Sequence, residues 1–491
     1  MDFLDPKKKK AHKRQLYIGY VLVGIAIFFA GVILLYAAFG YGFDRTGNVI
    51  QNGLVYIAST PENAEVNYKS TVSGEVRRVV TPDRLPIQAG EYEFEFLKEG
   101  YRPWQHKVDV HGGDVERLIY PFLFPEELKT SDISSYSKKP SFSSATPDRS
   151  KIVIAQPNKL GVFDVIETND PTKAATTVTL PSDVFALSTG TLSPVEWSND
   201  NRHLLLRHDY NKTTDFIIAD IDQPETSINI DTLFKREPKQ VTLFDKKPDQ
   251  FYMLLGNNQL LRADAGSKQA ERVLNDVLAY KSHGDNRLVY VTSKKSKKNY
   301  ASVFIRGDES SYKIRELRKS SSYLLDLAQH EDNWYVLTAS SAANEAYIYR
   351  NPFETLSSGD DARILVSRTL AIEQPQYASF SENTQFITLQ NDKKFATYDA
   401  YEDTEHYFEI ESGFDDKASR ATWMDGHRLM SSRKGKVIVF DFDGKNYQVL
   451  STITPGTRPM FDRDYNRMLT IAPSQVNSDK VALTDTLLRV E

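Results

Sequence analysis

The chain has 491 residues and no cysteine, 61 Lys and Arg against 66 Asp and Glu, and a formal net charge of -5. The absence of cysteine excludes a disulfide scaffold and a thiolate metal site. At roughly 150 residues per domain the length allows about three domains. The mean hydropathy of -0.46 excludes a polytopic membrane protein.

Residues 16–39 form an apolar run of 24 uncharged residues, long enough to cross a bilayer as one helix. Six basic residues precede it, whereas Arg45 is the one basic residue in the next twenty. The positive-inside rule therefore places residues 1–15 in the cytoplasm and the bulk of the chain outside the cell membrane. We predict a single-pass, uncleaved signal anchor, because the run ends without a small-x-small cleavage pattern. A nuclear localisation run at residues 6–14 is the weaker alternative.

The topology divides the charge unevenly. Residues 1–15 carry six basic and two acidic residues, a sum of +4, which leaves -9 for the exported part. An acidic exported part argues against sequence-independent nucleic-acid binding, which requires a basic face. We therefore expect no nucleic-acid partner.

Residues 50–124 show the alternation of short β-strands. It is clearest at residues 90–96, where three aromatic residues alternate with three glutamates, as in a strand with one packed and one wet face. Similar runs at 54–57, 64–68, 107–110 and 117–122 are separated by proline and glycine turns. The segment predicts a small antiparallel sandwich or sheet.

Residues 59–66, 81–82, 89–92 and 98–104 occur in the order that resembles a PEGA domain. Asn63 replaces the glycine of the name motif and is the next most tolerant residue for a left-handed turn. The resemblance implies a β-sandwich module of cell-envelope and surface-layer proteins, without enzymatic activity. The candidate ligand contacts are Pro61, Glu62, Asn63, Tyr101 and Trp104. The alternative is that the first three form a hairpin and the two aromatic residues pack the sheet.

Residues 125–142 contain five serines and no apolar period, and we predict a linker there. Beyond it, residues 143–491 repeat a strand that ends in a polar residue, with successive spacings of 42 to 56 residues. The repeated residues are Asp164, Asp220, Asp264, Arg306, Arg350, Asp399, Asp441 and Asp485. That period is typical of four-stranded propeller blades. We predict an all-β fold with seven or eight blades, eight being preferred.

A turn with aromatic and polar residues precedes several of these strands, at residues 197–200, 380–383, 423–426 and 461–464. Together with the repeated aspartates, these turns resemble the bacterial propeller repeats of the TolB and WD40-like kind. Residues 267–281 also carry apolar residues at helical spacing. We prefer an outer strand followed by the next inner strand.

No sequence motif of a hydrolase, a phosphate-binding loop or a metal centre occurs in the chain. The repeated aspartates occupy the same position in each repeat. This favours a role as caps on strand ends over a ring of catalytic carboxylates. We therefore expect no enzyme, cofactor or metal site. A local basic region is the candidate contact for an anionic envelope polymer or an acidic partner, with a solvated loop as the alternative. It consists of Lys294, Lys295, Lys297, Lys298, Arg306 and Arg350.

The sequence favours a membrane-anchored binding or scaffold protein of the cell envelope, whose propeller presents a surface to a protein or glycan. The alternative is an exported propeller-type hydrolase acting on envelope glycan or peptide, which needs carboxylates or a nucleophile gathered at the channel mouth. A sensor would additionally require a membrane partner, because the cytoplasmic tail is too short to signal alone.

Overall fold

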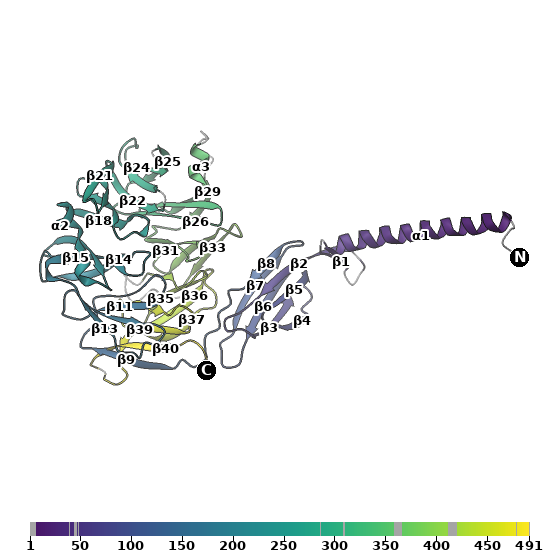
Figure 1. The fold of residues 1–491 in the computed structure, drawn as a ribbon, viewed down its shortest axis with the longest axis horizontal. Helices are drawn as coiled ribbons and strands as arrows, with labels where there is room; N and C mark the ends of the chain where they lie inside the picture. The colour runs from purple at the N-terminus through teal and green to yellow at the C-terminus, as the bar shows by residue number, and fades with distance from the viewer. Residues whose placement is uncertain are drawn as a thin grey trace. The chain divides into compact units, whose positions relative to one another are not determined.

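The computed structural model describes residues 6–490 except 39, 44–46, 48, 285, 308–309, 358–365, 411–419 and 478. The chain divides into two compact units. Unit 1 comprises Met1–Glu127 with Val490–Glu491, and unit 2 comprises Leu128–Arg489. Figure 1 shows the elements of both units.

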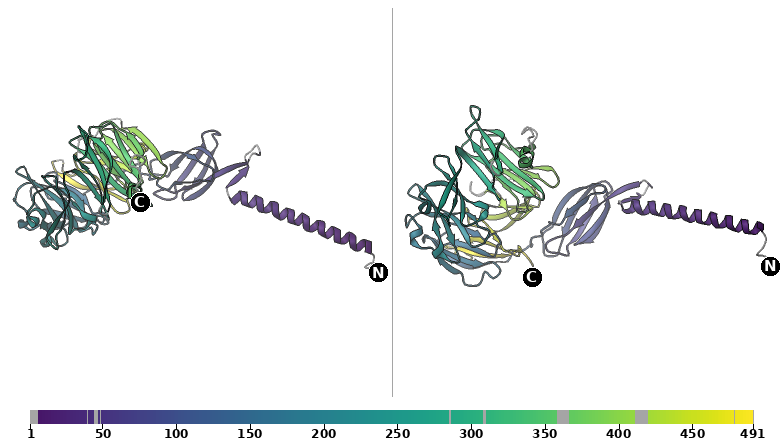
Figure 2. Two further views of the ribbon diagram at one scale, coloured as in Figure 1. Left: turned by 90° about the horizontal axis from the view of Figure 1, so that it is seen from above. Right: turned by 45° about the horizontal axis from the view of Figure 1, so that its top comes forward.

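The N-terminal helix α1 (Pro6–Ala38) contains the predicted anchor (Figure 2). Its segment His12–Tyr36 has a mean hydropathy of 2.7 and none of its apolar window is buried in the protein. Twenty-five helical residues rise about 38 Å, more than the hydrocarbon core of a bilayer. The helix is thus long and apolar enough to span a membrane. Residues 1–5 of the predicted tail, Phe39 and Arg45 lie outside the described residues.

The remainder of unit 1 is a sandwich of two four-stranded sheets. One sheet contains β1 (Tyr41–Phe43), β2 (Val49–Ile57), β5 (Asp83–Gln88) and β8 (Val115–Leu118). The other contains β4 (Val76–Val80), β3 (Glu65–Ser70), β6 (Gly90–Leu97) and β7 (Trp104–Val110). As the alternation predicts, Tyr92, Phe94 and Phe96 of β6 are buried in the core.

The sandwich differs from the prediction in two ways. It is not wholly antiparallel, because β8 pairs parallel with β2. The strands β4 and β5 were also not predicted. Among the described strands, β4 pairs only with β3, and it is mostly exposed. Its sequence Val-Arg-Arg-Val-Val therefore carries no alternating pattern. Strand β5 was missed because Pro82, directly before it, suggested a turn rather than a strand.

The described residues of unit 2 form eight four-stranded antiparallel sheets, which we call blades 1 to 8 in the order of their inner strands. Blades 1 to 4 are β10 (Ser143–Ala145), β11 (Lys151–Ala155), β12 (Val162–Glu167), β13 (Thr176–Thr179); β14 (Thr191–Trp197), β15 (His203–Tyr210), β16 (Thr213–Asp220), β17 (Ile228–Asn229); β18 (Pro238–Leu243), β19 (Gln250–Leu255), β20 (Leu260–Asp264), β21 (Gln269–Leu274); and β22 (Val277–His283), β23 (Arg287–Thr292), β24 (Tyr300–Gly307), β25 (Ser310–Arg318).

Blades 5 to 8 are β26 (Tyr323–His330), β27 (Asn333–Ser340), β28 (Glu345–Arg350), β29 (Val366–Ala371); β30 (Tyr377–Phe380), β31 (Phe386–Asn391), β32 (Lys394–Asp399), β33 (Thr404–Glu409); β34 (Thr422–Trp423), β35 (Arg428–Arg433), β36 (Lys436–Asp441), β37 (Gln448–Thr452); and β38 (Met460–Phe461), β39 (Arg467–Pro473), β40 (Val481–Leu487), β9 (Thr130–Tyr136). The short helices are α2 (Ile230–Phe234), α3 (Pro352–Ser357), η1 (Ser182–Val184), η2 (Pro224–Thr226) and η3 (Phe244–Lys246).

The predicted repeat corresponds to one strand of every blade. All eight residues of the series lie on the third strand, from Asp164 on β12 to Asp485 on β40. The segment with helical spacing forms β21 and β22, so the preferred interpretation as two strands is confirmed. Neighbouring blades enclose the hydrophobic core between their faces, as blades 1 and 2 do around Phe163 and Leu204.

The predicted linker is wrong over residues 130–136, which form β9 instead. This strand begins unit 2 and pairs with β40 at its end, so blade 8 combines both ends of the unit. Its residues Ile133 and Tyr136 pack with blade 1 residues Ile152 and Ile154. The serine-rich sequence hid the strand, because an outermost strand has one paired edge and few buried positions.

Candidate functional site

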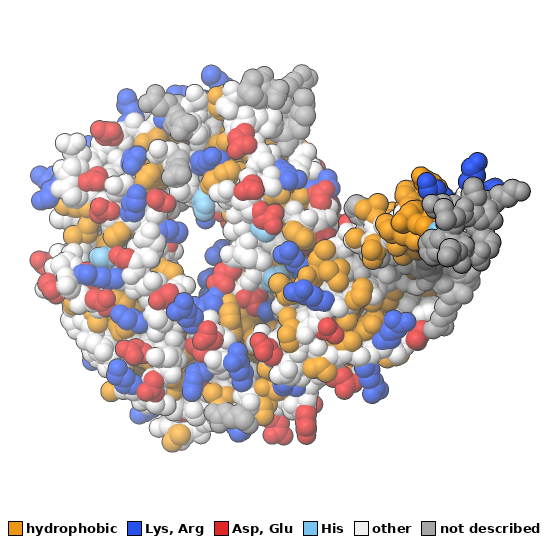
Figure 3. Space-filling view, turned by 45° about the vertical axis from the view of Figure 1, so that its right-hand side comes forward, with side chains coloured by type: hydrophobic (Ala, Val, Ile, Leu, Met, Phe, Trp, Pro, Cys, Tyr) orange, Lys and Arg blue, Asp and Glu red, His pale blue; other side chains and the backbone are white. Residues whose placement is uncertain are grey.

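A cavity of about 560 Å³ lies among the inner strands of unit 2. Figure 3 shows the opening in the middle of this unit, with acidic and basic side chains on its rim. The lining comes from blades 1, 2, 6, 7 and 8. It includes Ser143, Arg149, Pro194, Glu382, Thr422, Trp423, Met424, Thr457, Arg458 and Met460. Because residues far apart in the sequence meet there, this cavity is the candidate functional site.

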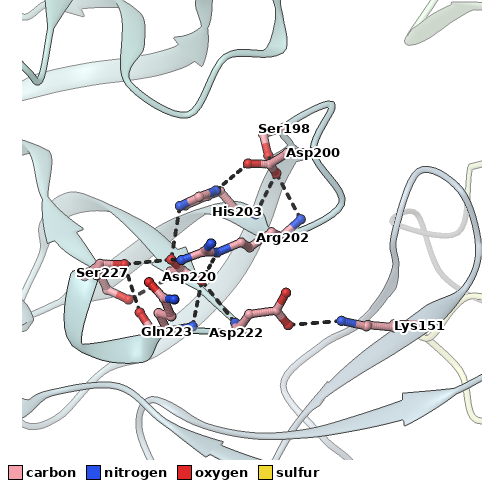
Figure 4. Close-up of polar contacts among 10 residues, drawn as sticks. Lys151, Ser198, Asp200, Arg202, His203, Asp220, Asp222, Gln223 and Ser227 are labelled. Atoms are coloured by element: carbon pink, nitrogen blue, oxygen red, sulfur yellow. Dashed lines mark hydrogen bonds and ion pairs between the residues drawn. The ribbon is translucent and has the colours of Figure 1, made fainter.

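Polar contacts fix the turn between the first and second strands of blade 2, as Figure 4 shows. Asp200 accepts hydrogen bonds from the backbone N–H groups of Arg202 (2.9 Å) and His203 (3.1 Å). Burial acts to raise the pKa of Asp200, but the hydrogen bonds from Ser198, Arg202 and His203 outweigh it and lower the pKa to about 2. The turn therefore carries a fixed negative charge.

Asp220, the repeated aspartate of blade 2, closes the same network. Its carboxylate accepts a bond from Arg202 Nε at 2.7 Å and bonds from the backbone N–H groups of Asp222 and Gln223 at 3.0 and 2.9 Å. These bonds keep the pKa of Asp220 far below its usual range despite burial. The carboxylate thus caps the strand end, as the sequence predicts.

Similar contacts recur in other blades. Asp399 accepts bonds from the backbone N–H groups of Tyr401 and Glu402 and from the Gln385 side chain. Because its side-chain partner is neutral, burial prevails and raises the pKa of Asp399. Asp485 pairs with Arg467. The repeated aspartates are therefore engaged within their own blades rather than gathered in a catalytic ring.

At one end of the cavity, three blades meet in a charged cluster. Arg149 of blade 1 forms an ion pair with Glu382 of blade 6, and its guanidinium lies 4.4 Å above the ring of Tyr465 of blade 8. The Tyr465 hydroxyl bonds to Glu382 (3.1 Å) and to the Met424 carbonyl (2.9 Å). Burial and the Glu382 charge raise the pKa of Tyr465. These groups hold one another and fix the turns around the cavity.

Two further arginines lie near the start of the inner strands β34 and β38. Arg458 lines the cavity two residues before β38, and Arg420 precedes β34 by the same distance. The guanidinium of Arg420 lies 5.5 Å from the ring centre of Tyr377, the first residue of β30. Both arginines are exposed to solvent.

The sequence-predicted residues Pro61, Glu62 and Asn63 form a surface turn of the sandwich. Asn63 has a φ of 61°, the left-handed conformation expected of the position. Lys98 Nζ donates to the Glu62 carbonyl at 2.6 Å, and the Thr81 hydroxyl accepts from the Ala64 N–H at 3.0 Å. The Glu62 and Asn63 side chains remain exposed.

Tyr101 and Trp104 are instead part of the sandwich core. The Trp104 ring contacts Phe96 edge-on, with the ring centres 5.2 Å apart. The Tyr101 hydroxyl accepts a hydrogen bond from the Val490 N–H at 2.8 Å. Their burial favours the packing interpretation, because neither ring offers a free face to a ligand.

The predicted basic region is not one patch. Lys294, Lys295, Lys297 and Lys298 lie in the hairpin before β24, whereas Arg306 lies near the far end of that strand, about 20 Å away. Arg350 likewise lies at the end of β28. The lysines also have acidic neighbours, since Lys294 pairs with Asp276 (2.6 Å) and Lys297 lies 3.9 Å from Glu316. Proximity in sequence misled the prediction, because successive loops of a blade lie at opposite ends.

The sequence interpretation missed the cavity arginines. Arg149 and Arg458, which line the cavity, occur as single residues in different repeats, and no local pattern separates them from other surface arginines. Glu382 lies in a turn that was recognised, but its partners come from other blades. The signal that could have found them is their position in the repeat, because each lies shortly before or after the inner strand of its blade.

Residues 52–122 match the family model of the PEGA domain, and no curated protein matches the chain. Among solved structures, the chain is similar to the Dos1 propeller, with 12% identity, a TM-score of 0.45 and coverage of 74% of this chain and 96% of that chain. The β-propeller domain of Myceliophteria thermophila Cps50 (Swd1) is similar with 10% identity, a TM-score of 0.40 and coverage of 74% of this chain and 100% of that chain. An oligogalacturonate lyase in complex with manganese is similar with 9% identity, a TM-score of 0.39 and coverage of 72% of this chain and 99% of that chain.

At sequence identities this low, the similarity to these solved structures concerns the fold alone. The expected fold class is confirmed: an N-terminal apolar helix, a PEGA β-sandwich and a β-propeller.

Proposed function

We propose that this protein is a membrane-anchored binding or scaffold protein of the cell envelope, with α1 in the cell membrane and the two β units outside it. The observation that carries the proposal is the cavity of about 560 Å³ at the centre of the propeller. Its volume lies in the range of ligand-binding cavities, and side chains from five blades converge on it. The PEGA domain and the apolar helix support an extracytoplasmic location.

A non-enzymatic role is part of the proposal. A glycan or peptide hydrolase needs paired carboxylates or a nucleophile with its base. Glu382 is the one carboxylate among the described residues that line the cavity, and it is engaged by Arg149 and Tyr465. The buried His208 is equally occupied, because its ring nitrogens contact Asp215 and the Thr189 carbonyl, each at 3.0 Å.

The test is affinity capture with the full chain in detergent micelles, using a solubilised envelope extract. We expect the wild type to retain an envelope protein or glycan. Ser141→Trp places an indole at the cavity lining and should reduce capture at least tenfold, whereas Ser321→Trp, at an exposed turn remote from the lining, should not. Retention of no protein, peptidoglycan or anionic polymer by the wild type would contradict the proposal.

A further inference from the structure

The helix α1 joins the PEGA sandwich without a linker. It ends at Ala38, and the carbonyl of Gly40 already accepts a hydrogen bond from the Asn52 N–H of β2 at 2.8 Å. The apolar span ends at Tyr36, so even a fully extended chain separates Tyr36 from Gly40 by at most about 14 Å. Covalent geometry alone therefore ties this end of the sandwich, which we call the helix-proximal end, to the end of the span.

An aromatic contact also connects the span to the sandwich. The ring of Tyr41, the first residue of β1, lies with its centre 5.1 Å from that of Tyr36, and both side chains are exposed. Tyrosines are enriched at the membrane–water interface, because the ring is apolar and the hydroxyl is polar. If α1 spans the membrane, this pair lies at the interface, and one of its members belongs to the sandwich.

The strand register shows which connections lie at the helix-proximal end. Asn52 pairs with Gln88 at the end of β5, and its carbonyl accepts a hydrogen bond from the Gly113 N–H at 3.0 Å. In the other sheet Ser70, the last residue of β3, pairs with Tyr92 near the start of β6. The connections at this end that the structure describes in full are therefore residues 71–75, 88–90 and 111–114.

The tips of these connections carry no charge. Residues 71–74, 88–90 and 111–113 contain no Asp, Glu, Lys or Arg. Glu75 and Asp114 follow the tips, and Glu75 lies 3.7 Å from Arg77. At the opposite end, the connections at 58–64 and 98–103 carry Glu62, Lys98, Glu99 and Arg102. The two ends of the sandwich thus differ in the environment that they suit.

Val72 is the most prominent side chain of the helix-proximal end. It lies at the tip of the β3–β4 turn and is 91% exposed, the largest fraction among the large hydrophobic residues that the structure describes. Val49 of β2 and Val76 of β4 are also more than half exposed. Apolar side chains on an uncharged tip gain free energy when they leave water for the boundary between lipid headgroups and acyl chains.

We propose that the helix-proximal end of the PEGA sandwich rests on the membrane surface, with Val72 in the boundary between lipid headgroups and acyl chains. The inference rests on the proposed function, because it requires α1 to span the membrane. Thr71 and Ser73 lie in the hydrated headgroup layer. The bilayer thereby holds the sandwich in one orientation, whereas a sandwich on a flexible tether would tumble freely.

Fluorescence quenching of the full chain in phosphatidylcholine vesicles tests the inference. The chain has no cysteine, so Val72→Cys carries the environment-sensitive dye NBD at one position. Lipids with a nitroxide near the headgroup, present in both leaflets, should quench this probe by roughly half and shift its emission to shorter wavelength. The control is Glu62→Cys, in an exposed turn at the opposite end, whose probe should not be quenched. An unquenched probe at position 72, or equal quenching at both positions, overturns the inference.

A second comparison excludes an effect of the dye itself. With the probe on Ser73→Cys, adding Val72→Asp should abolish most of the quenching, because a charge is expelled from the boundary. Val476→Asp is the matched control, since Val476 is 88% exposed in unit 2, and it should leave the quenching unchanged. Equal quenching with and without Val72→Asp contradicts the inference.

The failure of the inference and that of the proposed function have different signatures. A chain that resists alkaline extraction from the vesicles but leaves the probe at position 72 unquenched contradicts the inference alone. A quenched probe in a chain that captures no envelope partner contradicts the proposed function alone. A chain that alkaline washing removes from the vesicles contradicts both.

Discussion

Asp220 shows how one carboxylate stabilises a whole blade. Its side chain is fully buried and joins the inner turn, through Arg202, to the loop after β16. Replacing the charge by an amide leaves Arg202 without its counter-ion and turns an N–H donor toward other donors. Asp220→Asn should lower the free energy of unfolding by about 2 kcal/mol. The exposed neighbour Asp222, which pairs with Lys151, gives the control Asp222→Asn, with an expected loss below about 1 kcal/mol.

The effect of Asp220 also has a pH dependence with a defined sign. Its folded-state pKa is depressed below the ordinary aspartate value of 3.8, so its contribution is fully present above about pH 4. It is lost as the pH falls through the depressed folded-state pKa. Denaturant midpoints measured between pH 4 and pH 8 should therefore show a constant difference between Asp220→Asn and the wild type. A difference that vanishes by pH 6 would argue against a charged Asp220.

Asp231 is the opposite case. Burial is the main cause that raises its pKa to about 7, and the charge of Asp215 adds to it. Its unfolded-state pKa is about 3.8, so the folded state is progressively penalised as the pH rises from about 4 to about 7. Asp231→Asn keeps the acceptor for the Phe216 N–H and removes the penalty. We expect it to raise the melting temperature more at pH 8 than at pH 5. Glu237→Gln should show a smaller trend of the same sign, because the charge of Glu237 also raises the pKa of Asp231. The exposed Glu225→Gln, in η2, is the control that should show none.

Among the elements, the short strand β9 contributes to the stability of two blades. It supplies the fourth strand of blade 8 and packs Tyr136 between blades 8 and 1. Tyr136→Ala should cost about 3–5 kcal/mol, as expected for an aromatic side chain removed from a core. Tyr300→Ala, at an exposed strand start, should cost less than about 1 kcal/mol. Equal denaturation midpoints for the two variants would show that the packing of β9 does not stabilise the junction between blades 8 and 1.

The elements also show what the sequence can reveal. Period-two alternation identifies β6, and the repeated aspartate identifies the third strand of every blade, because both patterns are local. Strands β4 and β9 escape detection, since edge strands bury few side chains. The cavity arginines escape for a different reason. Their meeting depends on which blades are neighbours around the ring, and no short segment of sequence contains that information.

At the scale of the whole molecule, the membrane topology remains a prediction. It can be tested by cysteine labelling, because the chain has no cysteine of its own. Single-cysteine variants His12→Cys, Ser73→Cys and Ser321→Cys report on the tail side, unit 1 and unit 2 respectively. A membrane-impermeant maleimide added to intact cells stripped of any outer barrier should label the second and third variants. It should label His12→Cys only after permeabilisation. Labelling of His12→Cys in intact cells would reverse the orientation.

The pairing of β9 with β40 has a consequence for biogenesis. Thr130 and Thr486 share a hydrogen bond across 356 residues, so the contact that closes blade 8 is among the most distant in the chain. A chain exported from its N-terminal anchor onward delivers β9 early and β40 last. Until then β9 and the face of blade 1 have no partner, and closing so long a loop is slow. Under the proposed topology, export of this propeller therefore ends with blade 8 still open, the interval in which chaperones or proteases outside the membrane have their greatest access to it.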